Sequence, residues 1–141
     1  GALSPGAKDL INQFGTASTA DIHVFYCYET KDPNGSRLAG FAIMESSLSP
    51  LSPFHNNIFV DRNRKIFTAA HELGHLLSHR DHAEMNPDSN SPLSYHLGDE
   101  LNIEGSHLYD HNLMKKGTSD SNVLEASKRI HRFQQIWMLK N

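Results

Sequence analysis

The hydrophobic and polar positions in the first third of the chain predict one helix and two strands. Residues 4–14 have the start signals of a short helix, and Gly15 is its stop signal. Residues 21–29 (DIHVFYCYE) and 37–44 (RLAGFAIM) are rich in β-branched and aromatic residues, which is typical of strands. The turn sequence DPNG at residues 32–35 lies between them. We therefore expect the two strands to form a hairpin or to be neighbours in a sheet.

The same pattern predicts where the strands lie in the sheet and where two further helices occur. Residues 21–29 carry apolar side chains on both faces, which predicts a central strand, and residues 57–60 predict a short strand. Residues 63 to about 78 and 122 to about 139 are predicted helices, whereas residues 80–117 lack periodicity. The expectation is an α+β fold in which a small mixed β-sheet packs on the helix of residues 63–78. An irregular C-terminal half and a C-terminal helix follow, in one domain spanning residues 1–141.

Composition narrows the range of partners. The chain has 141 residues, 38% of them hydrophobic, and a net charge of -3, which fits a globular domain and argues against nucleic acid or an anionic membrane as partner. No apolar run approaches the roughly 20 residues that span a bilayer. One cysteine permits no internal disulfide, so the compartment stays open, with a secreted bacterial enzyme among the options. We expect a monomer.

The candidate chemistry lies in the predicted helix of residues 63–78. The segment HELGH places His71 and His75 four residues apart, so that both imidazoles point to one side of a helix and reach one zinc ion. Glu72 is placed to hold a zinc-bound water, to take its proton and to deliver that proton to a leaving amine. The sequence thus predicts a zinc metalloendopeptidase that acts on protein or peptide substrates, with one Zn²⁺ per chain and Glu72 as general base.

A family resemblance accompanies this segment. Residues 20–139 resemble the metzincin clan of zinc endopeptidases in HELGHLL, in the strand pair, and in Asn112-Leu113-Met114, which is similar to that clan's methionine turn. The resemblance implies that Met114 forms a hydrophobic floor beneath the metal. It also implies that residues 37–44 are an edge strand that pairs with substrate through backbone hydrogen bonds.

The third zinc ligand is where the chain departs from the clan pattern HExxHxxGxxH. Ser78 stands at the glycine position and Asp81 at the last histidine position, with His82 one residue later. Ser78 cannot adopt the positive φ of a glycine cheaply, so the turn is expected to be one residue longer and to deliver His82. A small set of similar enzymes uses aspartate here, which keeps Asp81 as the alternative. We expect His79 to lie on the surface.

Other interpretations stay open. A fourth protein ligand from His79 or Asp81 would close the site and make it a non-catalytic zinc-binding domain. A zincin with a distant glutamate ligand would use Glu100 or Glu104. A deformylase would use Cys27, although a thiol inside an apolar strand is expected to be structural. An oxyanion-stabilising residue would come from a separate group of side chains: Tyr95, His107, Tyr109 and His111.

Overall fold

The computed structural model contains two compact units, Gly1–Arg64 and Lys65–Asn141, which are described separately below. The residues that the structure describes are 3–14, 22–43, 54–79, 82–84, 95–96, 112–115, 130, 135 and 138–139. In this part of the chain the elements are two helices and five short strands, so the α+β class is confirmed. None of the described helices is long and apolar enough to cross a membrane.

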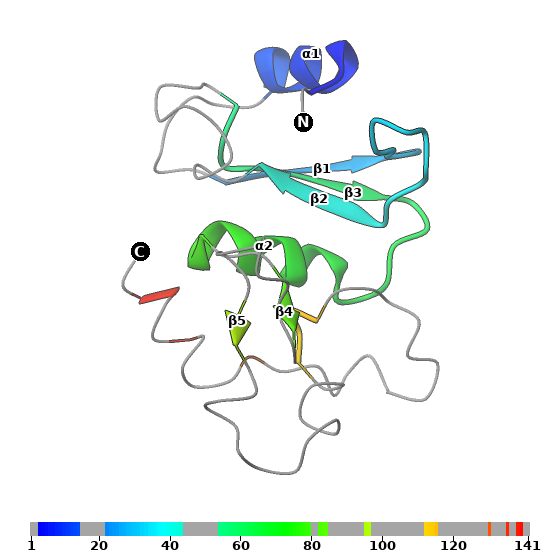
Figure 1. The fold of residues 1–141 in the computed structure, drawn as a ribbon. Coiled ribbons are helices and arrows are strands. Elements are labelled where there is room, and N and C mark those ends of the chain that lie inside the picture. Colours follow the sequence, from blue (N-terminus) through cyan, green and yellow to red (C-terminus); the bar gives the residue numbers. More distant parts are fainter. Residues whose placement is uncertain are drawn as a thin grey trace. The chain divides into compact units, whose positions relative to one another are not determined.

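The first unit is built around a three-stranded mixed sheet with the strand order β1-β3-β2 (Figure 1). The central strand β3, Asn57–Asp61, runs parallel to β1, His23–Cys27, and antiparallel to β2, Gly40–Ile43. All five residues of β3 are buried, and this strand is paired on both edges. The predicted mixed sheet is therefore present, and its best buried strand is the one that the sequence marked as short.

Two predictions about the sheet are wrong. β1 and β2 are not neighbours, because each pairs with β3, and only the bridge between Lys31 and Arg37 remains of the expected hairpin. β1 is at the edge of this sheet rather than in its centre, and its outer face exposes Val24 at 41% and Tyr26 at 65%. The apolar residues on both faces of this strand predicted a central position. The prediction failed because tyrosine is amphipathic and tolerates an exposed position.

Helix α1, Pro5–Phe14, lies over one face of the sheet (Figure 1). Its buried residue Ile11 packs in a cluster with Ile43 and Phe59. The ring of Phe59 stacks between Phe25 at 5.0 Å and Phe41 at 4.9 Å, so one aromatic row ties the three strands together. This helix was predicted with its correct end, because Pro at the start and Gly15 after the end are unambiguous signals.

The carboxylate of Asp61, at the end of β3, fixes the loop between β1 and β2. Its two oxygens accept hydrogen bonds from the Thr30 amide (2.8 Å), the Asn63 amide (2.7 Å), and Nε and Nη2 of Arg37 (2.9 and 2.8 Å). Asp61 is fully buried, and the Arg37 guanidinium holds the pKa of that carboxyl well below its usual range. The first unit therefore satisfies its buried charge with its own groups.

The second unit contains helix α2, Thr68–Ser78, and two short strands, β4, Ala83–Glu84, and β5, Tyr95–His96, which pair in parallel. The helix begins five residues later than predicted, at Thr68, because the chain first makes turns through Arg64 and Lys65. Ile66 was expected among the apolar residues that this predicted helix buries. It instead precedes the helix and is 80% exposed. Most of the predicted helix of residues 122–139 lies outside the described residues. Of the positions described, residues 135, 138 and 139 are helical and residue 130 is not.

Candidate metal centre

Helix α2 carries the first two histidines of the site on one side. Their spacing of four residues brings Nε2 of His71 to 3.2 Å from Nε2 of His75, with the rings nearly perpendicular at 88°. Two nitrogens that each lie about 2.0–2.1 Å from one ion with tetrahedral angles are separated by about 3.3–3.4 Å. The pair in α2 therefore already has the separation of two ligands of a tetrahedral metal ion.

The end of α2 turns the chain back toward these two rings. His79 adopts the left-handed conformation (φ 53°), and its amide donates to the carbonyl of His75 at 3.0 Å. Ser78 stays helical and buried, and its hydroxyl donates to the carbonyl of Gly74 at 2.7 Å. The positive φ expected of the clan glycine thus falls one residue later, at His79. His79 is the C-cap of the helix and is partly exposed.

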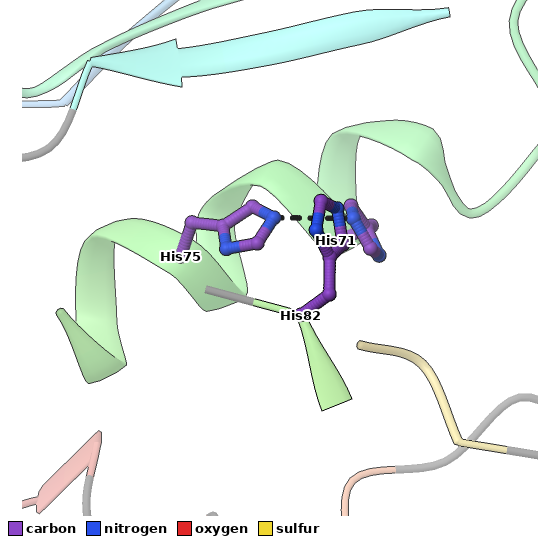
Figure 2. A group of neighbouring side chains, drawn as sticks. All are labelled: His71, His75 and His82. Carbon is purple, nitrogen blue, oxygen red and sulfur yellow. Dashed lines mark hydrogen bonds between the residues drawn. The ribbon is translucent and has the colours of Figure 1, made fainter. Parts of the chain in front are cut away.

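His82, three residues beyond this turn, completes a group of three imidazoles (Figure 2). One nitrogen from each of His71, His75 and His82 lies within 4.8 Å of the other two. The ring centroid of His82 is 5.3 Å from that of His71 and 4.9 Å from that of His75. The structure therefore brings the three predicted ligands together. The largest of these nitrogen separations exceeds the edge length of a tetrahedral site by at most about 1.5 Å.

A tight turn at residues 112–115 holds the ring of His71 through a backbone carbonyl. Nδ1 of His71 lies 2.6 Å from the carbonyl oxygen of Leu113, and a carbonyl only accepts, so Nδ1 donates. Met114 is fully buried, and a Cβ on Gly74 would overlap its sulfur, so the turn packs directly on α2 where that helix lacks a side chain. The described residues thus place Met114 against Gly74 of α2, and its assignment as a methionine turn stays a prediction.

The sequence analysis missed the role of Asn112. This residue is fully buried, and its Oδ1 accepts a hydrogen bond from the Met114 amide at 2.8 Å, which shapes the turn. Asparagine two residues before a buried methionine is a recognisable turn signal, because its side chain bonds the backbone two residues on. Without the fold, nothing in the sequence shows that this turn lies against His71.

Two further predicted residues have defined positions. Glu72 lies on α2 directly after His71 and is buried, with 7% of its surface exposed. Cys27 belongs to β1 of the first unit, where it packs against the core cluster and burial raises the pKa of its thiol. It is not among the grouped metal-ligand side chains, which favours the structural interpretation of this cysteine.

The remaining candidates lie outside what the structure describes. For Tyr95 the backbone alone is described. The other candidates outside the described residues are Asp81, Glu100, Glu104, His107, Tyr109 and His111. The choice between His82 and Asp81, and a fourth ligand or distant glutamate, therefore stay predictions, although the described residues bring His82 and not His79 to the first two histidines.

Comparison with known proteins adds no relative to this geometry. No protein-family model, no curated protein and no solved structure matches the chain. The residues of the histidine group are therefore the basis for proposing a function.

Proposed function

We propose that the chain is a zinc-dependent endopeptidase of the metzincin-like type. The observation that carries this proposal is the convergence of His71, His75 and His82, with the first two already at the separation of two tetrahedral ligands. When bound, zinc would polarise the scissile carbonyl and lower the pKa of a water in the open fourth position.

The kind of donor favours zinc over the hard cations. Three imidazole nitrogens suit zinc and other late transition metals, whereas Ca²⁺ and Mg²⁺ take oxygen ligands. His71 presents Nε2 to the group because its Nδ1 donates to Leu113, which is the arrangement that a metal-binding histidine needs. With these three histidines as the only protein ligands, the fourth position would be left for water, unlike in a closed structural site.

Glu72 is the residue that we assign to proton transfer. It follows His71 directly on α2, lies three residues before His75 and is buried. There it would accept a proton from the attacking water and then donate it to the nitrogen of the departing amine. A protein or peptide chain is the proposed substrate.

The test is the hydrolysis of casein and of a peptide library by Glu72→Gln, with zinc content measured on the same preparation. We expect one zinc per chain and a loss of turnover of about a thousandfold, because the amide keeps the shape but cannot take the proton. Glu29→Gln, at an exposed carboxylate paired with Lys31 in the first unit, is the matched control and should keep full activity. Wild-type turnover in Glu72→Gln would contradict the assigned base. Zinc binding without any peptide hydrolysis by the native chain would favour a non-catalytic domain.

A further inference from the structure

The peptide group between Leu113 and Met114 is held at both ends. Its carbonyl oxygen is 2.6 Å from Nδ1 of His71, and its N–H donates to Oδ1 of Asn112 at 2.8 Å. These two hydrogen bonds belong to one rigid plane, because the peptide bond does not rotate. Fixing the N–H therefore fixes the direction of the carbonyl, and the two bonds polarise each other.

The orientation of this carbonyl decides which nitrogen of His71 carries the proton. A neutral imidazole has one N–H and one lone pair, and the Leu113 carbonyl is able to accept only from an N–H. Nδ1 is therefore protonated, and the lone pair is at Nε2. Nε2 is the atom that faces His75 at 3.2 Å, inside the histidine group.

We propose that Asn112 is a positioning residue for metal binding: through the Leu113–Met114 peptide it holds His71 in the tautomer and ring orientation that present Nε2 to the ion. The site in which this matters rests on the proposed function. Partners of this kind, one step behind a metal ligand, set the ligand's tautomer and basicity. Asn112 does not touch the ion.

The packing around residues 112–115 holds this turn in one position. Asn112 and Met114 are both fully buried, and the amide of Lys115 donates to the carbonyl of Asn112 at 3.2 Å, which closes the turn. On the other side Met114 occupies the space that a side chain at Gly74 would need. The turn thus contacts α2 within one helical turn of His71, on a surface that leaves it little freedom.

The first experiment measures the tautomer of His71 in the metal-free full-length protein. Nitrogen NMR on histidine-labelled protein distinguishes protonation at Nδ1 from protonation at Nε2, and the His71 signals are assigned by their loss in His71→Gln. We expect protonation at Nδ1. Protonation at Nε2 in the wild-type chain would overturn the inference, and this result does not depend on whether any metal binds.

The second experiment compares zinc affinity and tautomer in Asn112→Ala, Asn112→Asp and Asn57→Ala. Asn112→Ala should lose the fixed Nδ1 proton and bind zinc about 10- to 100-fold more weakly, whereas Asn112→Asp keeps an oxygen acceptor and should keep the tautomer. Asn57 is an equally buried asparagine in the first unit, whose Nδ2 donates to the carbonyls of Phe54 and His55. Its loss should lower stability but leave the tautomer and zinc affinity unchanged.

The outcomes separate this inference from the proposed function. A wild-type chain that binds no zinc contradicts the proposed function. If such a chain and Asn112→Asp have His71 protonated at Nδ1 and Asn112→Ala does not, the control of the His71 tautomer by Asn112 still stands. A chain that binds zinc equally well in wild type and Asn112→Ala, with the same tautomer, refutes the positioning role and leaves the proposed function standing. If Asn112→Ala does not fold, the wild-type spectrum and Asn112→Asp decide.

Discussion

The carboxylate of Asp61 in the first unit and the histidine group in the second unit differ in the groups that face them. In the first unit the carboxylate of Asp61 accepts hydrogen bonds from Thr30, Asn63 and Arg37, so its charge is balanced by groups of the chain itself. In the second unit three imidazoles turn nitrogen atoms toward one another, 3.2 Å apart for His71 and His75. Facing lone pairs repel unless a proton or a cation lies between them. The first arrangement supports a fold, and the second is suited to a ligand.

Metal removal should therefore affect the two units unequally, and this is the largest expected effect on stability. Chelation should remove about 4 kcal/mol of stabilisation if free zinc had been about a thousand times its Kd. Hydrogen exchange should show lost protection in α2 and in residues 112–115, with a smaller change in β3. His82→Ala serves as the control and should show no dependence on chelator. Equal loss of protection in both units would contradict the comparison.

Removing the charge of Asp61 should destabilise the first unit and leave the histidine group intact. Asp61→Asn should lower the free energy of unfolding by about 3 kcal/mol, because it removes the charge opposite Arg37 and replaces one of the two acceptor oxygens by an NH₂ donor. It should leave zinc affinity unchanged. Asp32, an exposed carboxylate that accepts from the amides of Asn34 and Ser36, is the matched control, and Asp32→Asn should cost less than about 1 kcal/mol. Urea titrations with zinc held constant measure both. A Asp61→Asn chain of wild-type stability would show that the carboxylate is not needed.

The same carboxylate gives the first unit a defined response to acid. The pKa of Asp61 is lower in the folded chain than in the unfolded chain, chiefly because of Arg37. Its contribution is therefore complete above the unfolded pKa of about 3.9 and is lost as the pH falls from there toward the folded pKa. Urea titrations between pH 6 and pH 3 should show this loss in the wild-type chain and a flatter profile in Asp61→Asn.

The smallest expected effect concerns the turn that delivers His82. His79 has a positive φ, which costs energy for a residue with a Cβ, so His79→Gly should stabilise the protein by about 0.5–1 kcal/mol and keep zinc affinity. Ser78→Gly is the contrasting change, because Ser78 is helical and its hydroxyl bonds the Gly74 carbonyl, and it should destabilise by about 1 kcal/mol. Thermal melting of zinc-loaded protein ranks the three chains. A stabilising Ser78→Gly would mean that the turn lies at Ser78 instead.

Helix α1 and the His71–His75 pair could be predicted from the sequence, because residues close together in the chain determine both. α1 has its start and stop residues within its own sequence, and the spacing of His71 and His75 needs only a helix to bring them together. The absence of a positive φ at Ser78 was also predicted, whereas its location at His79 was not.

Features that depend on distant partners could not be predicted in this way. β1 was expected in the centre of the sheet, but the pairing of strands is set by β3, which comes later in the chain. The contact of Leu113 with His71 joins residues 42 positions apart, and the pairing of Asp61 with Arg37 joins residues 24 positions apart. A period or a motif carries no information on such contacts, whereas the packed structure does.

The zinc affinities of His82→Ala and Asp81→Ala, measured side by side in the full chain, test the three-histidine site most directly. We predict that His82→Ala loses zinc binding, because only two nitrogen ligands on α2 remain. Asp81→Ala should bind within about tenfold of wild type, as for a residue that at most supports a ligand. The opposite result, with zinc lost in Asp81→Ala and retained in His82→Ala, would contradict the account and establish the aspartate as the third ligand.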